Sequence, residues 1–258
     1  MTGTASASQH DDKPKRLDEL LVALGHYASR SRARDAIGRG AVMVDGRPAA
    51  KAGQAVSPSS AIAVDDPAQG YVSRAALKLV AGLDAFGFDP AGLTALDVGA
   101  STGGFTQVLL ERGAASVLAV DVGHGQLDPR VAADPRVTSM EGLNARDLKA
   151  AHLQGHRIKI LVSDVSFISL TLALPPALEL ADAGAQVVLL VKPQFEAGRE
   201  AIGKGGMLKR PGDGPLVAER LRAWLDGVPG WRAVGLIASP VEGGDGNREF
   251  LLGGIKDR

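Results

Sequence analysis

The sequence of 258 residues contains no cysteine, which excludes disulfide bonds, thiolate nucleophiles and metal sites built on cysteine. It also lacks an apolar run long enough to span a membrane, and residues 1–15 lack the apolar core of a signal peptide. The five histidines show no metal-ligand spacing, so we expect no metal site. The net charge is zero, so the composition as a whole does not indicate a polyanionic partner. We expect a cytoplasmic protein without a membrane partner.

Basic residues are nevertheless concentrated in one part of the chain. Residues 13–51 contain nine Lys or Arg and four acids, a local balance of +5. Leucines within residues 17–24 recur at i, i+3, i+4 and i+7, which predicts a short helix. Ser29 or Ser31 is suited to cap a second helix that carries several arginines. Two short apolar runs beyond it, the first followed by an Asp-Gly turn, predict a small sheet.

Three motifs strengthen this interpretation: R-L-D, S-R-x-x-A-x-x-x-I and G-x-V-x-V-x-G. The segment that contains them, residues 16–65, closely resembles the S4 RNA-binding domain. The resemblance implies that its arginines meet folded RNA, where phosphate contacts give affinity and shape gives selectivity. A solvated basic helix is the alternative. The candidate RNA-binding residues in and just beyond this segment are Arg16, Arg30, Arg32, Arg34, Arg39 and Arg74.

The rest of the chain has a different organisation. Residues 66–72 contain proline and glycine with little apolar periodicity and form the expected linker, whereas residues 1–15 form an expected disordered tail. In residues 73–258, apolar strands alternate with helical stretches. This pattern predicts a mostly parallel, seven-stranded sheet covered by helices on both faces. The expected strands are the run around Leu96 and Val98 and residues 116–120, 137–140, 158–164, 185–192, 231–238 and 250–252.

A glycine-rich turn after the first of these strands predicts a pocket for an adenosine-bearing cofactor. The spacing is D-x-G-x-x-x-G-G, and the next strand ends at an acid that suits ribose hydroxyls. An acid beside the turn is awkward for a pyrophosphate but suits the cationic S-adenosylmethionine. An ordinary βα turn is the alternative. The cofactor candidates are Asp97, Gly99, Ser101, Gly103, Gly104 and Asp121, with Asn144 and Asp147 added by analogy with related folds; Asp147 has a helix cap as its alternative role.

Four further residues suggest the chemistry. Asp164 and Lys192 each follow an apolar strand, where ligands bind in sheets of this kind. Lys78 precedes the glycine-rich turn, and Glu249 enters the last strand. In order and context, these four residues resemble the K-D-K-E set of FtsJ-type ribose 2′-O-methyltransferases.

The whole chain resembles the TlyA family, also called haemolysin A, through VSRAALKL, LDVGASTGGFT, AVDVGHGQLDPRV, SDVSFISL, LVKPQFEAGREAIGKGG and NREFLL. Ala75 and Ala76 depart from the glycine pair of many members. The resemblance implies a Rossmann-like class I methyltransferase domain behind the S4-type domain. It also implies methyl transfer from S-adenosylmethionine to the ribose 2′-hydroxyl of cytidine in ribosomal RNA, in the small subunit and in some members also the large. Lys192 would act as base or as stabiliser of the developing alkoxide.

Residues 198–214 are rich in glycine and predict a flexible loop that folds over the RNA backbone, or simply a mobile surface loop. Two other functions stay open: a non-catalytic RNA-binding or ribosome-assembly factor, and a membrane-active haemolysin-like protein. The target nucleotide and the oligomeric state also stay open, and a monomer is compatible with the sequence. The basic candidates in this loop are Arg199, Lys204, Lys209 and Arg210.

Overall fold

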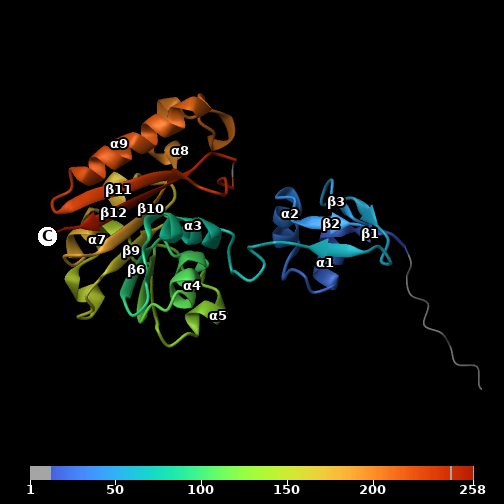
Figure 1. Cartoon of the computed structure of the whole chain (residues 1–258), viewed down its shortest axis with the longest axis horizontal. Helices are drawn as coiled ribbons and strands as arrows, with labels where there is room; N and C mark the ends of the chain where they lie inside the picture. The colour runs from blue at the N-terminus through green and yellow to red at the C-terminus, as the bar shows by residue number, and fades with distance from the viewer. Residues whose placement is uncertain (1–12, 245, 258) are drawn as a thin grey trace, which may run out of the picture. The chain divides into compact units, whose positions relative to one another are not determined.

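The computed structural model describes residues 13–244 and 246–257, and the chain divides into two compact units between Gly70 and Tyr71 (Figure 1). Of the tail expected at residues 1–15, residues 1–12 lie outside the described part, and Lys15 already belongs to a strand. Among the described residues, every helix is too short or too polar to cross a lipid bilayer.

The first unit is a small α+β domain, as predicted. Its leucine-rich helix buries Leu17, Leu20 and Leu21, and Ser29 caps the second helix by accepting a hydrogen bond from the Arg32 amide. β2 pairs antiparallel with β3 and β5, and β1 pairs with β4. The elements are β1 (Lys15–Arg16), α1 (Leu17–Ala23), α2 (Arg30–Gly38), β2 (Val42–Val44), β3 (Arg47–Pro48), β4 (Ala55–Val56) and β5 (Ile62–Val64).

The start of the expected linker packs onto this first unit. The Asp66 carboxylate accepts a hydrogen bond from the Tyr27 hydroxyl at 2.9 Å and forms an ion pair with Arg39 at 2.8 Å. Ala68 is buried, and the Gln69 side chain donates to the His26 carbonyl. The segment from Asp66 to Gln69 is therefore held by contacts within the first unit.

The second unit contains a seven-stranded sheet with helices along its faces. Its helices are α3 (Ala76–Phe86), α4 (Gly104–Glu111), α5 (Pro129–Ala132), α6 (Leu170–Ala173), α7 (Pro175–Leu180), α8 (Pro193–Glu196) and α9 (Gly214–Asp226). Its strands are β6 (Thr94–Val98), β7 (Ser116–Asp121), β8 (Val137–Glu141), β9 (Ile160–Ser163), β10 (Gln186–Val191), β11 (Trp231–Ala238) and β12 (Phe250–Lys256). Short 3₁₀ helices are Ala145–Asp147, Ala150–Leu153, Arg199–Ala201, Lys204–Gly206 and Pro211–Asp213.

The strand order is β11-β12-β10-β9-β6-β7-β8, and the predicted mostly parallel sheet is confirmed. Strands β8, β7, β6, β9 and β10 are mutually parallel, whereas β12 runs antiparallel between β10 and β11. Alternate residues of a strand point to opposite faces, and the core follows this rule. Leu96 and Val98 belong to one hydrophobic cluster, whereas Ala95 belongs to the other.

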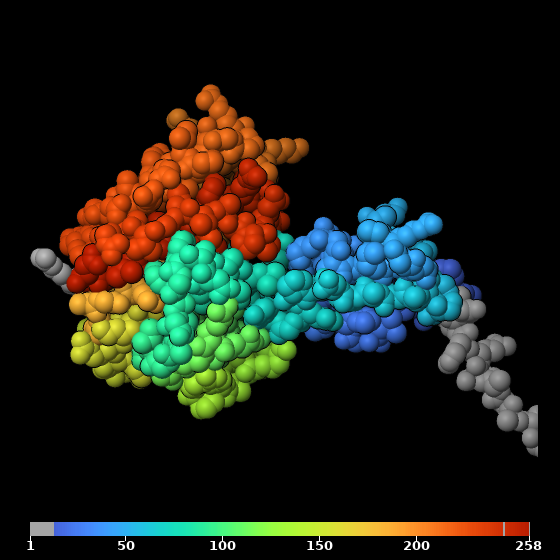
Figure 2. All heavy atoms as spheres, in the orientation of Figure 1, coloured from blue at the N-terminus to red at the C-terminus, as the bar shows by residue number. Residues whose placement is uncertain are grey.

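Helix α3 packs closely against the antiparallel end of the sheet, as the turquoise and red segments in Figure 2 show. A Cβ atom built on Gly253 would come within 2.5 Å of the Phe86 ring, and one on Gly235 within 2.7 Å. Glycine at these positions leaves room for Phe86, so α3, which carries Lys78, lies directly against β12.

Candidate active site

A cavity of about 460 Å³ lies where the chain leaves β6, β7 and β9. These three strands are parallel neighbours, so the turns that follow them meet at one edge of the sheet. The volume falls within the usual range for small-molecule sites, about 300–1,000 Å³. Its lining includes five of the predicted site residues, Gly99, Ser101, Asp121, Asn144 and Asp164.

The glycine-rich turn forms one wall of this cavity. Gly99 has φ +87°, and a Cβ atom there would lie 3.0 Å from the Val165 amide nitrogen. Both observations require glycine, because the backbone after β9 crosses directly against the turn. Gly104 lines an adjoining hollow of about 70 Å³ that shares Gly99, Ser101 and Asp164 with the main cavity, and Gly103 precedes α4 with φ +92°.

Asp121, the last residue of β7, is fixed by two backbone amides. Its Oδ2 atom accepts from the Ser101 amide at 2.8 Å, and its Oδ1 atom accepts from the Gly123 amide at 2.7 Å. Each carboxylate oxygen can accept a further hydrogen bond, so the group is held in place and still able to receive ligand hydroxyls.

The charged residues that line the described cavity are acidic, Asp121 and Asp164, and its lining includes no Lys or Arg. A pyrophosphate would find no cation there, whereas a ligand that carries a sulfonium and an ammonium would find two carboxylates. The acidic lining of this cavity therefore fits S-adenosylmethionine, but its acids are Asp121 and Asp164 and not Asp97, the acid beside the glycine-rich turn from which the cofactor was predicted.

Four predicted cofactor residues do not line the main cavity: Gly103 and Gly104, which belong to the glycine-rich turn, and Asp97 and Asp147. Asp147 is exposed at the end of the 3₁₀ helix Ala145–Asp147, while the neighbouring Asn144 does line it. Asp97 is fully buried in β6, where its Oδ2 atom accepts from the Thr106 hydroxyl at 2.7 Å. Burial raises the pKa of Asp97 to about 7, the Thr106 hydrogen bond opposes this rise, and the negative charge of Asp164 adds to it.

Beside the cavity, the predicted four-residue set forms two lysine–carboxylate pairs. Lys192 Nζ lies 2.6 Å from Asp164 Oδ1 and donates to the Ser166 hydroxyl, also at 2.6 Å. Lys78 Nζ lies 2.5 Å from Glu249 Oε2, and both side chains are buried. Lys192 thus contacts two residues that line the cavity.

The strand register brings these two pairs together. Val191 pairs with Phe250 across β10 and β12, so Lys192 and Glu249 are the next residues at the same end of the two antiparallel strands. Burial raises the pKa of Glu249, the positive charges of Lys78 and Lys192 lower it, and the negative charge of Asp164 raises it. Glu249 therefore senses the charges of the other three predicted residues.

Comparison with known proteins shows the family to which this chain belongs. Residues 71–256 match the family model described as FtsJ-like methyltransferase, and residues 15–62 match the S4 domain. The chain is 46% identical to the 16S/23S rRNA (cytidine-2′-O)-methyltransferase TlyA of Mycobacterium tuberculosis over 241 residues, covering 92% of this chain and 88% of that protein. The chain belongs to the TlyA family. Its second unit is a methyltransferase domain, and its first unit is an S4 domain.

Two further relatives agree with this assignment. The chain is 40% identical to the putative rRNA methyltransferase YqxC of Bacillus subtilis, covering 93% of this chain and 85% of that protein. The solved structure of a putative hemolysin from Streptococcus thermophilus is 38% identical, with a TM-score of 0.73, and the match covers 95% of this chain and 89% of that chain. This TlyA-family chain therefore shares both domains with its relatives.

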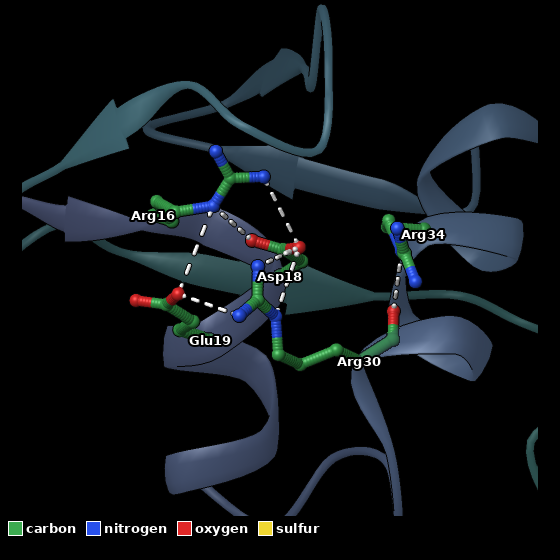
Figure 3. Close-up of polar contacts among 5 residues, drawn as sticks. All are labelled: Arg16, Asp18, Glu19, Arg30 and Arg34. Atoms are coloured by element: carbon green, nitrogen blue, oxygen red, sulfur yellow. Dashed lines mark hydrogen bonds and ion pairs between the residues drawn. The ribbon is translucent and has the colours of Figure 1, made fainter.

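In the S4 domain, two predicted RNA-binding arginines are engaged in ion pairs. Figure 3 shows the guanidinium groups of Arg16 and Arg30 converging on Asp18 and Glu19. Arg16 and Arg30 each lie 3.1 Å from the Asp18 carboxylate, which is fully buried, while both arginines remain about half exposed. Arg30 therefore helps to hold α2 to α1, and Arg16, on β1, pairs with the same two acids of α1.

The other arginines of the S4 domain differ in exposure. Arg39 is partly buried and pairs with Asp35 and Asp66. Arg34 is exposed, and its Nε atom donates to the Arg30 carbonyl, whereas Arg32 is partly exposed on α2. Arg74 belongs to the methyltransferase domain, where it is partly exposed just before α3.

The basic loop, residues 198–210, carries exposed Arg199, Lys204, Lys209 and Arg210. It has internal order, because Ile202 and Leu208 form an antiparallel bridge and the Gly203 amide donates to the Met207 carbonyl at 2.7 Å. A sequence rich in glycine does not reveal these contacts.

Sequence reasoning did not single out three residues that line the cavity, Gln126, Ser166 and Phe167. Phe167 is 90% exposed, has φ +64° and contacts the Phe195 ring at a centroid distance of 5.0 Å. All three lie in the stretches AVDVGHGQLDPRV and SDVSFISL, whose family resemblance was the available signal.

Proposed function

We propose that this enzyme transfers a methyl group from S-adenosylmethionine to the ribose 2′-hydroxyl of cytidine in ribosomal RNA of the small subunit, with the large subunit as a second candidate substrate. The observation that carries the proposal is the Lys192–Asp164 pair at the rim of an acidic cavity. The name of the M. tuberculosis relative supports the ribosomal substrate and the cytidine 2′-oxygen.

The cofactor would be held by residues of the glycine-rich turn and by Asp121. Asp121 is suited to accept hydrogen bonds from the ribose hydroxyls, because both of its oxygens are already oriented by backbone amides. Gly99, Ser101, Gly103 and Gly104 would contact the methionine end. Asn144 would contact the adenine end, with Asp147 nearby. When bound, S-adenosylmethionine supplies a methyl group activated by its sulfonium.

The protein's own contribution is to position and deprotonate the ribose hydroxyl. Lys192 Nζ, held by Asp164 and Ser166, would act as base or stabilise the alkoxide that develops as the proton leaves. The buried Lys78–Glu249 pair would fix the electrostatic environment of Lys192 from the neighbouring end of β12. Asp97, buried in β6 just before the glycine-rich turn, would affect the cofactor site only through that turn and would not contact the cofactor.

Ribosomal RNA would meet the S4 domain and the basic loop. Arg32 and Arg34 on α2 would supply phosphate contacts, and Arg16, Arg30 and Arg39 would keep part of their positive potential for RNA while bound to carboxylates. In the methyltransferase domain, Arg74 and the four cations of the basic loop would contact the RNA backbone near the reacting nucleotide.

The proposal is tested by tritiated methyl transfer from S-adenosylmethionine to purified ribosomal subunits that lack the modification, followed by mapping of 2′-O-methyl positions. We expect incorporation at a cytidine ribose. Lys192→Ala should abolish it and leave cofactor affinity unchanged, because Lys192 does not line the cavity. Lys159→Ala is the matched control, since Lys159 precedes β9 at the opposite edge of the sheet. No incorporation into either subunit by the unaltered enzyme would refute the proposal.

A further inference from the structure

A buried side chain, Asn247, links the basic loop to the segment that precedes β12. Its Oδ1 atom accepts from the Leu208 amide at 3.2 Å, and its Nδ2 atom donates to the Gly206 carbonyl at 3.0 Å. Asn247 is 3% exposed, so these hydrogen bonds are shielded from water. A buried amide that bonds both to an acceptor and to a donor on the same loop fixes that loop in one orientation.

Asn247 also lies two residues before Glu249. The two side chains are buried, whereas Arg248 between them is exposed, which is the alternation of an extended segment. The backbone around both residues is anchored, because the Asn247 carbonyl accepts from the Gly243 amide and the Glu249 carbonyl accepts from the Ser239 amide, each at 2.9 Å. A displacement of Asn247 would therefore be transmitted to Glu249 through two peptide units.

Glu249 has little freedom to absorb such a displacement. Its carboxylate contacts Lys78 Nζ at 2.5 Å in a buried site, and it senses the charges of Lys192 and Asp164. The cations of the basic loop are exposed at the other end of the same connection, with Lys204 in the short helix that ends at Gly206. One continuous path thus joins the exposed cations, Asn247 and the four-residue set.

We propose that Asn247 is a positioning residue that couples RNA engagement by the basic loop to the geometry of the Lys78–Glu249 pair. The inference rests on the proposed function. RNA phosphates that bind the loop stabilise the loop conformation that Asn247 clamps, and the clamp holds Glu249 where it supports Lys192. The loop then contributes to turnover as well as to RNA affinity.

The first test is the variant Asn247→Ala, assayed at saturating RNA and cofactor. We expect kcat to fall on the order of tenfold to a hundredfold, because small displacements at a reacting site have effects of that size. Cofactor affinity should not change, since Asn247 does not line the cavity. Trp231→Phe is the matched control for stability: it removes the buried hydrogen bond from Trp231 Nε1 to the Leu178 carbonyl, at the far end of β12. This control should lower the Tm without lowering kcat.

A merely structural role for Asn247 would lower the Tm and leave kcat at the level of the Trp231→Phe control, and that result would overturn the proposal. If Asn247→Ala does not fold, Asn247→Asp replaces it, because it keeps an acceptor for the Leu208 amide and loses the donor to the Gly206 carbonyl. We expect its kcat to fall below that of the Trp231→Phe control, and a kcat equal to that control would overturn the proposal.

The second test is a double-mutant cycle with Lys204→Ala. In the unaltered background, this variant should lower both RNA affinity and kcat. In the Asn247→Ala or Asn247→Asp background, it should still lower RNA affinity but should lower kcat by a smaller factor. Equal factors on kcat in both backgrounds would overturn the coupling. Because every comparison is made against an active unaltered enzyme, this failure is distinguishable from failure of the proposed function, in which that enzyme transfers no methyl group.

Discussion

The fully buried carboxyl of Asp97 makes the stability of the methyltransferase domain depend on pH, and the variant Asp97→Asn should reveal it. Asp97 lies in the interior strand β6, where the hydroxyl and the backbone amide of Thr106 donate to its carboxylate, and burial raises its pKa from 3.8 to about 7. Asparagine has nearly the same shape and no charge. Its extra amide hydrogens are unsatisfied at every pH, so their cost cancels when pH values are compared.

The direction of this pH dependence follows from the difference in proton binding between the folded and the unfolded chain. Between pH 3.8 and about 7 the folded domain keeps a proton on Asp97 that the unfolded chain releases, so stability falls as pH rises through this window and levels off above it. The complete loss corresponds to about 4 kcal/mol, of which about 3 kcal/mol falls between pH 5 and pH 8. As the pH rises from 5 to 8, the free energy of unfolding of Asp97→Asn should therefore increase by about 3 kcal/mol relative to that of the unaltered protein.

Urea unfolding followed by tryptophan fluorescence suits this measurement, because both tryptophans, Trp224 and Trp231, lie in the methyltransferase domain. The cofactor is omitted, since its positive charge would oppose the raised pKa. Asp147→Asn serves as the control, because it removes an exposed acid from the same domain. If the stability difference between Asp97→Asn and the unaltered protein were equal at pH 5 and pH 8, the assignment of Asp97 as a buried acid titrating near neutrality would be wrong.

Three further outcomes are expected. Asp18→Asn should destabilise the S4 domain by about 2 kcal/mol above pH 3.8, where the paired carboxylate is charged. The loss should be smaller below this pH, because the paired arginines lower the pKa of Asp18 against the effect of its burial. Amide hydrogen exchange in residues 17–38 measures the loss, and equal protection in both proteins would contradict it. Gly99→Ala should weaken S-adenosylmethionine binding at least about tenfold in calorimetry, because the added Cβ meets the backbone after β9; unchanged affinity would argue against the cavity as the cofactor site. Tyr27→Phe should lower the stability of the S4 domain by about 1 kcal/mol and speed amide exchange near Asp66, because it removes the 2.9 Å hydrogen bond to the Asp66 carboxylate. Unchanged exchange there would show that this hydrogen bond does not stabilise the segment.

Much of the fold could be predicted because its strands are continuous apolar runs. The run that ends at Asp121 and the run that precedes Lys192 are bounded within a residue of their observed limits, since buried parallel strands leave little ambiguity about where apolar sequence stops. The predicted last strand, residues 250–252, was too short. It continues through Gly253 and Gly254 to Lys256, and glycines reduce the strand signal in sequence even though here they make room for packing.

The partners of charged residues were not predictable. Lys78 and Glu249 are 171 positions apart, and they come into contact because helix α3 packs against β12. In the S4 domain, the sequence shows an excess of arginine but does not show that Asp18 is buried between two of these residues. Charge counts measure composition, whereas the potential available to RNA depends on which charges are already paired.

The insertion of β12 between β10 and β11 has a consequence for how the enzyme is made. Strands β6 to β10 can pair in the sheet as they emerge during synthesis, but β11 joins the sheet through β12, which follows it in the chain. Glu249 immediately precedes β12, so it reaches Lys78 only when that strand has inserted. The S4 domain and the cavity can thus form on a nascent chain in which the four-residue set is still incomplete.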